Sequence, residues 1–263
     1  MDIELLQKHF GRMGARVKLR AVAGGGWRRS AAGIDIRTDD KGEFFELRID
    51  PAQPVDYRVV DLQPHARHLL LLGEQKNKFL CGHDERHWFV CAVPGRSVTN
   101  VRQAMEALQP SEVRWAVNRY VKRVKHRLRR HNEAFVRQGE WFFLPAPRLK
   151  VNPLEIRRNE PLSRGRGSKP HMCQFAYRYA GWPVMVCDWY PAGMAIESYE
   201  RLLQADSGAR YWNWQQMQRD AAVYVRGRVW HPDHQTIVLD GWHRVVMNTE
   251  GQAPGSRAVV FLD

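Results

Sequence analysis

The sequence predicts an α+β fold: an antiparallel, β-rich N-terminal half, a central long basic amphipathic helix, and a β-rich C-terminal half with two helices. Short apolar runs separated by Gly, Pro and Asp recur through the first 97 residues and again after residue 140, which is typical of antiparallel sheets. Between these parts, apolar residues recur at steps of three and four, the period of a helix. We therefore expect a β-rich domain over 1–97, a helical connector over 98–139 and a β-rich domain over 140–263.

The N-terminal part begins with a predicted helix over residues 2–12, because Asp2 can accept a hydrogen bond as its N-cap and Leu6 and Phe10 lie on one face. Runs rich in β-branched and aromatic residues follow it, and Gly- or Pro-containing turns separate them. The expected strands are 15–21, 33–37, 43–49, 57–62, 68–72 and 88–93.

Two helices are expected in the middle of the chain. Thr99 is the expected cap of a short one that runs to about residue 108. A second begins at Pro110-Ser111 and ends near Gly139, a residue type that often follows a helix. Its apolar stripe is Val113, Val117, Tyr120, Val121, Val124, Leu128 and Phe135.

The C-terminal part reads as a strand over 140–144, a loop-rich stretch over 145–170, and strands over 172–179 and 184–189. Helical stretches are expected over 195–204 and 212–219. A meander of strands follows over 222–230, 236–239 and 242–247, with Asp240-Gly241 as a two-residue hairpin turn. A strand over 258–262 is expected at the edge.

Almost all of the net charge lies between Arg114 and Lys169. This stretch has 16 Lys and Arg against 4 Asp and Glu, so it carries +12 of the total +13. Such a local excess is typical of a protein with a polyanionic partner, most often nucleic acid. A solvated surface or an acidic protein partner would also account for it. The expected phosphate contacts are Arg119, Lys122, Arg123, Lys125, Arg127, Arg129 and Arg130 on the basic helix, and Arg164, Arg166 and Lys169 in a Gly/Arg loop.

Histidines and acids form two clusters at expected turns. Together they can bind a divalent metal ion or act as general acids and bases. The candidate catalytic residues are His83, Asp84 and His87 in the first cluster and His231, Asp233 and His234 in the second. With a turn at Asp240-Gly241, His243 would lie about 14 Å from His234, too far to share a metal. Turn and cap roles remain an alternative for both clusters, and His171, after the Gly/Arg loop, is expected to be structural rather than a base.

Several other classes lack support in the sequence. No apolar run is long enough to span a bilayer, and there is no secretory signal pattern, so a cytoplasmic location without membrane contact is expected. The four cysteines form no C-x-x-C pair and are expected to be free thiols. P-loop, Rossmann, H-E-x-x-H and G-x-S-x-G motifs are missing.

The function that the sequence favours is nucleic-acid binding, with RNA slightly ahead of DNA. No groove-reading module is recognisable, and the many aromatic residues suit the stacking of unpaired bases; the candidates are Trp182, Trp189, Tyr190, Tyr211, Trp212 and Trp214. A metal-dependent nuclease or phosphodiesterase that uses the two His/Asp clusters is the main alternative. A third reading is an assembly subunit whose basic helix docks on an acidic protein, so the sequence leaves open whether the chain is an enzyme.

Overall fold

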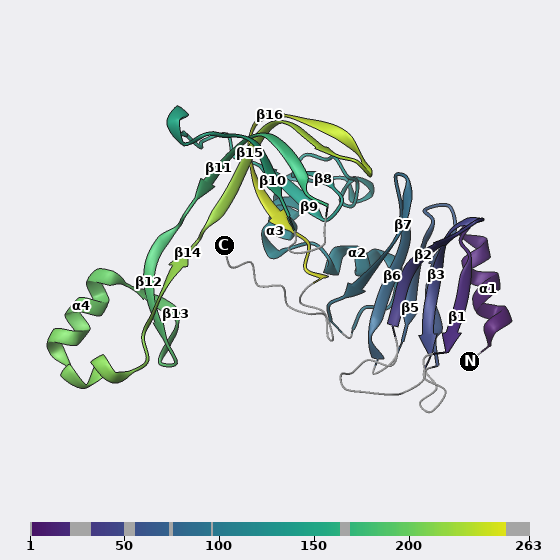
Figure 1. Ribbon diagram of the computed structural model, residues 1–263, viewed down its shortest axis with the longest axis horizontal. Coiled ribbons are helices and arrows are strands. Elements are labelled where there is room, and N and C mark those ends of the chain that lie inside the picture. Colours follow the sequence, from purple (N-terminus) through teal and green to yellow (C-terminus); the bar gives the residue numbers. More distant parts are fainter. Residues whose placement is uncertain are drawn as a thin grey trace.

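The computed structural model describes residues 2–21, 33–49, 56–73, 76–95, 97–163 and 169–250 (Figure 1). The chain is a mixed α+β protein in which strands outweigh helices, as the sequence predicts. Layered sheets form the N-terminal part, a curved six-stranded sheet forms the centre, and a long arm projects from that sheet (Figure 1). Among the described residues, no helix has the length and apolar content needed to cross a membrane.

Helix α1 (Ile3–Arg12) and two sheets make up the N-terminal part. Asp2 Oδ1 accepts a hydrogen bond from the Leu5 amide at 3.0 Å, which confirms the expected N-cap. One sheet has the order β1-β3-β2 and contains a parallel pair, β1 with β3, so the expectation of a purely antiparallel half is wrong. The strands of the two sheets are β1 (Val17–Ala21), β2 (Gly33–Asp39) and β3 (Gly42–Ile49), and β4 (Arg58–Gln63), β5 (His68–Leu72), β6 (Lys78–Asp84) and β7 (His87–Val93).

The leucine run of β5 is continuous because both faces of its sheet are covered. Leu69 and Leu71 pack into the core that also contains Phe45, while Leu70 belongs to a second core with α2 (Val101–Ala107). Side chains alternate between faces along a strand, so a strand buried on both sides needs apolar residues at every position. Helix α2 is capped by Asn100, whose Oδ1 accepts from the Gln103 amide, and not by Thr99.

The prediction of a long basic helix over residues 110–139 is wrong. Helix α3 (Ser111–Tyr120) ends at Val121, which has an extended backbone, and is followed by the 3-10 turn η2 (Val124–His126) and strand β8 (Val136–Gln138). In one straight helix Val113 and Phe135 would lie about 33 Å apart. The folded chain instead buries both in a single cluster with Phe142, so tertiary packing wins over the helical pattern.

The central sheet has the order β10-β11-β15-β16-β9-β8. Its apolar positions alternate: Trp141 and Phe143 of β9 face one core, whereas Phe142 and Leu144 face the cluster with α3. After β9 comes the short 3-10 turn η3 (Pro153–Glu155). The strands of this sheet, besides β8, are β9 (Trp141–Pro145), β10 (Arg157–Leu162), β11 (His171–Tyr179), β15 (Ala222–His231) and β16 (His234–Met247).

The hairpin turn of the C-terminal meander lies elsewhere than expected. Strand β16 runs without a break through Asp240-Gly241, and the chain reverses at Pro232-Asp233, where His231 pairs with His234. Gly227 has a φ of +78°, and the register between β15 and β16 shifts next to it, so the two long strands bend together at a bulge. This shift in the turn moves His231 and His234 to the tip of the hairpin.

The arm consists of a small sheet of order β13-β12-β14 with α4 (Ile196–Ala205) and the 3-10 turn η4 (Ser207–Tyr211) near its end (Figure 1). Its strands are β12 (Trp182–Cys187), β13 (Tyr190–Ala195) and β14 (Gln215–Arg219). The helix expected over 212–219 is wrong, because residues 215–219 pair with β12. The strand expected over 258–262 lies outside the described residues.

Candidate metal centre

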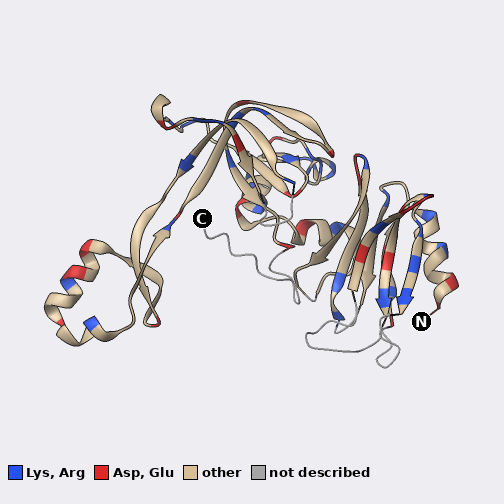
Figure 2. Ribbon diagram, in the orientation of Figure 1, with Lys and Arg blue, Asp and Glu red and all other residues tan. Residues whose placement is uncertain are grey.

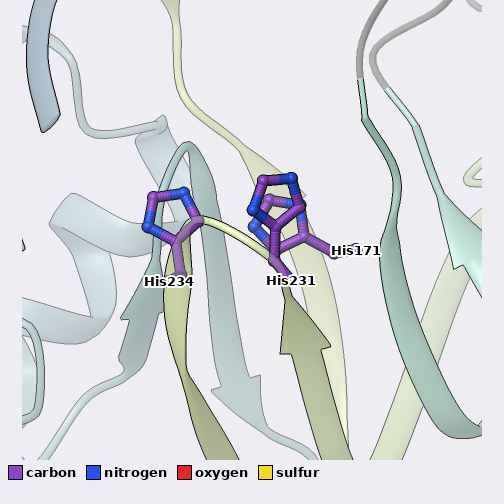
Figure 3. A group of neighbouring side chains, drawn as sticks. All are labelled: His171, His231 and His234. Atoms are coloured by element: carbon purple, nitrogen blue, oxygen red, sulfur yellow. The ribbon is translucent and has the colours of Figure 1, made fainter. Parts of the chain in front are cut away.

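Three histidines meet where β11 begins beside the tip of the β15–β16 hairpin (Figure 3). Met172 pairs with Trp230 across the β11–β15 ladder, which places His171 next to His231. The ring centroid of His171 lies 4.3 Å from that of His231 and 5.4 Å from that of His234. One ligand nitrogen from each histidine can be chosen so that all three lie within 4.8 Å of one another.

His171 is the most unusual member of the cluster. Its residue is only 2% exposed, and neither ring nitrogen has a hydrogen-bond partner in the described part of the chain. Buried polar atoms without partners are rare in proteins and call for an explanation. Burial, together with the neighbouring His231 and His234, lowers the pKa of His171 to about 3, so its imidazole is neutral at pH 7. Neutral imidazole is the form that binds a metal.

Gly139 leaves open a space beside the rings of His171 and His234. It has a φ of +56°, which favours glycine, and it follows β8 directly. A Cβ atom at this position would lie 2.9 Å from Nε2 of His234 and 3.3 Å from Nε2 of His171. Zinc–nitrogen bonds of about 2.1 Å in a tetrahedral set place the nitrogens about 3.4 Å apart. The three chosen nitrogens lie within 4.8 Å of one another, so the rings would have to draw closer to hold one ion.

The outer nitrogens of the cluster also have defined surroundings. Glu85, at the tip of the β6–β7 hairpin, places Oε2 3.7 Å from Nδ1 of His234 and accepts a hydrogen bond from the Gln235 amide. His231 Nδ1 accepts from the Asp233 amide at 3.1 Å, and its Nε2 lies 3.3 Å from the carbonyl oxygen of Lys169. Metal binding through Nε2 would require His231 to give up that last, long contact.

The predicted catalytic residues are only partly brought together. His231 and His234 belong to the cluster, and Asp233 lies at its edge, where Lys169 Nζ binds it at 2.9 Å. The two hairpin tips do meet, since His87 Nε2 lies 3.9 Å from Asp233 Oδ1. Residues 83, 84 and 87 nevertheless have other partners.

His83 packs its ring against Trp88, Asp84 forms an ion pair with Arg130, and His87 Nδ1 lies 2.8 Å from Glu43. The group of potential metal ligands among the described residues therefore does not include these three residues, and their catalytic roles stay a prediction. The sequence reasoning missed His171 as a ligand, because only the long-range pairing of β11 with β15 brings it to the hairpin tip. The spacing of His231 and His234 was the one local signal.

The predicted phosphate contacts over residues 119–130, here called the basic segment, form an irregular surface rather than a helical one. Figure 2 shows Lys and Arg concentrated on the loops and strands around β8, whereas both signs of charge are mixed on the N-terminal sheets. Arg127 donates to Asn118, and Arg130 pairs with Asp84 and Glu85, so both have structural roles. Arg164 and Arg166 lie outside the described residues. The exposed members are Arg119, Lys122, Arg123, Lys125 and Arg129.

The predicted base-stacking aromatics lie on the arm. Trp182, Trp189 and Tyr211 are exposed. Tyr190 is stacked with both Trp212 and Trp214 at centroid distances of 6.4 and 5.7 Å. Whether these rings bind bases stays a prediction.

No protein-family model, no curated protein and no solved structure matches this chain. The chemistry of the site therefore rests on its residues. Three imidazoles are the donor set of zinc, copper and nickel rather than of magnesium or calcium, which prefer oxygen. Three protein ligands around zinc leave a fourth position open, as in catalytic rather than structural sites.

Proposed function

We propose that this chain is a metal-dependent phosphodiesterase that acts on nucleic acid, with zinc held by His171, His231 and His234. The observation that carries the proposal is the burial of His171 with both ring nitrogens unpartnered beside two other histidines. A metal ion supplies the missing partner of such a ring. Without one, stacking three histidines in a buried site costs desolvation and gains no hydrogen bond at His171.

The metal supplies the nucleophile in this proposal. Zinc held by His171, His231 and His234 would supply hydroxide at neutral pH, because zinc in such sites lowers the pKa of a bound water to about 7. Glu140 follows Gly139 and lines the same cavity as His234. Burial lowers the pKa of His234, which favours the neutral form that binds a metal. We assign Glu140 the role of proton acceptor at this position.

The basic segment supports nucleic acid as the substrate. Five of its side chains are exposed, and the described residues provide no ion pair for Lys122, Arg123, Lys125 or Arg129. Arg130, at the end of the segment, binds Glu85, whose carboxylate lies beside His234. A phosphate backbone that follows the segment would thus be led toward the histidines. We favour RNA over DNA because the sequence has no recognisable groove-reading module and its many aromatic residues suit the stacking of unpaired bases.

The test combines cleavage with metal loading. Purified full chain is incubated with single-stranded RNA, duplex RNA and duplex DNA, with zinc, manganese or magnesium and with a chelator. The proposal expects cleavage that the chelator and His171→Ala abolish, and that the exposed control His65→Ala leaves unchanged. Salt-sensitive binding without cleavage would leave only a nucleic-acid-binding protein. If the wild-type chain neither binds nor cleaves nucleic acid, an acidic protein becomes the favoured partner of the basic segment.

A further inference from the structure

A cavity of about 310 Å³ lies between the four-stranded N-terminal sheet and the central sheet, next to the histidine cluster. His234, Gly139 and Glu140 form part of its lining, so the cavity opens on the proposed metal position. Apolar side chains such as Phe89, Leu108 and Phe142 form other parts of its wall. Its size lies at the lower end of the range of small-molecule sites.

Arg137 is the only lysine or arginine that lines this cavity within the described chain. It lies on β8, two residues before Gly139, and its amide donates to the Arg130 carbonyl oxygen at 2.6 Å. The neighbouring Gln138 side chain instead donates to the backbone oxygens of Val229 and Gln235. The alternation of a strand therefore directs Arg137 and Gln138 to different surroundings.

The side chain of Arg137 is 25% exposed, and its guanidinium has few partners in the described part of the chain. Its Nε is buried without a hydrogen-bond partner among the described residues, and its closest carboxylate contact is 3.9 Å, from Nη2 to Asp84 Oδ1. Burial lowers the pKa of the Arg137 guanidinium. Taking a charge out of water is unfavourable unless another group compensates it.

The nearby acids are largely committed to other cations. Asp84 and Glu85 pair with Arg130, and Asp233 pairs with Lys169. Two further acids line the cavity, Glu140 and Glu250, and Glu250 accepts a hydrogen bond from the Ala92 amide. Arg137 thus lines the cavity together with the proposed metal ligand His234, and its one carboxylate contact among the described residues is the 3.9 Å contact with Asp84.

We infer that Arg137 binds the anionic phosphoryl oxygens of a substrate in this cavity. The planar guanidinium presents N–H donors in a fork that matches phosphate geometry. This inference deepens the proposed function and rests on it for the identity of the substrate. It assigns a phosphate subsite to the space between Arg137 and the three histidines.

The test uses inorganic phosphate as the probe. Phosphate is titrated calorimetrically into the full chain, with and without one equivalent of zinc, and bound zinc is measured in each sample. Arg137→Gln is expected to weaken phosphate binding by at least about tenfold without loss of zinc, since hydrogen bonds to charged groups are among the strong ones. Arg12→Gln, which removes an exposed cation at the end of helix α1 that does not line the cavity, is the matched control and should bind phosphate as the wild type does.

Wild-type phosphate affinity in a folded Arg137→Gln variant would overturn the inference, as would the absence of phosphate binding at millimolar concentration. If that variant does not fold, ¹⁵N NMR of the wild type decides. The Nε–H resonance of Arg137, identified by its loss in Arg137→Lys, should shift on addition of phosphate, and an unmoved resonance would refute the subsite.

Failure of the proposed function gives a different result. A chain that binds phosphate through Arg137 but takes up no zinc keeps the anion subsite and loses the metal-dependent hydrolase. A chain that binds zinc and cleaves nucleic acid with no effect of Arg137→Gln on phosphate binding keeps the hydrolase and loses this subsite.

Discussion

Glu85 and His234 lie on hairpins from opposite parts of the chain, and Glu85 Oε2 lies 3.7 Å from His234 Nδ1. Glu85 has a φ of +46°, a backbone conformation that is unfavourable for a residue with a side chain. The same carboxylate binds Arg130 and the Gln235 amide. The N-terminal sheets thus place a carboxylate near the outer nitrogen of the proposed metal ligand, and this nitrogen has no hydrogen-bond partner among the described residues. Shortening of this contact to a hydrogen bond would give the carboxylate–histidine pair that orients ligands in metal sites.

Glu85→Gln should weaken zinc binding by about 10- to 100-fold, the usual effect of removing a carboxylate behind a histidine ligand. Zinc affinity is measured by competition with a chromophoric chelator. Glu133→Gln is the control, because Glu133 contacts His126 away from the cluster. Equal zinc affinities in Glu85→Gln and the wild type would show that Glu85 only joins the two hairpins.

Gly139→Ala should abolish zinc binding, because its Cβ would occupy the space between Nε2 of His234 and Nε2 of His171. Gly42→Ala provides a matched control. Gly42 also has a positive φ, +97°, but nothing lies within 4 Å of the added Cβ. Both variants should lose about 1 kcal/mol or somewhat more of stability through backbone strain, and only Gly139→Ala should lose the metal. Full zinc binding by Gly139→Ala would place the ion elsewhere.

The combined change Lys122→Glu, Arg123→Glu and Lys125→Glu should remove most nucleic-acid binding without unfolding the chain, since all three side chains are exposed. The slope of log affinity against log salt should fall by about 0.7 for each lost phosphate contact on single strands. The control reverses three exposed cations of the N-terminal part, Lys8, Arg12 and Lys41. Equal losses in both triple variants would indicate a general charge effect rather than a binding surface.

Asp39 should make the fold sensitive to acid. Hydrogen bonds from Arg16 and Lys18 hold the pKa of Asp39 below its ordinary value near 3.8. Because the folded pKa is the lower one, the stabilisation is complete above the ordinary value and is lost as the pH falls below it.

Thermal unfolding checks this pH dependence. Asp39→Asn should lower Tm at pH 7. The difference in Tm between this variant and the wild type should become smaller as the pH falls from 4 toward 2. Asp188→Asn, at an exposed position of the arm, should have the Tm of the wild type at pH 7 and throughout the acidic range. A constant difference between Asp39→Asn and the wild type across this range would contradict the ion-pair account.

The sequence predicted most strands because their patterns are local. The leucine run at 68–72 matches β5, and the Asp2 cap matches the start of α1. The basic helix could not be predicted correctly, because the burial of Phe135 beside Val113 depends on packing between segments far apart in the chain. The same applies to the reversal at Pro232-Asp233, where the long pairing of β15 with β16 outweighs the local turn signal at Asp240-Gly241.

In the candidate site too, local sequence patterns predicted some residues, and long-range pairing brought in the others. His231 and His234 are three residues apart and stood out in the sequence, whereas His171 joins them only through the pairing of β11 with β15. Arg130 looked like a surface cation, but its partners Asp84 and Glu85 come from another sheet. Reversing the charge of Arg130 would therefore disturb the fold as well as the basic surface.

Zinc content per chain tests the metal site most directly. The full chain, His171→Ala and the control His65→Ala are stripped with chelator, given one equivalent of zinc, freed of unbound metal and analysed by mass spectrometry of the element. The site predicts about one zinc per chain in the wild type and in His65→Ala, and almost none in His171→Ala. A wild-type chain that keeps no zinc, or a folded His171→Ala that keeps as much as the wild type, would contradict it.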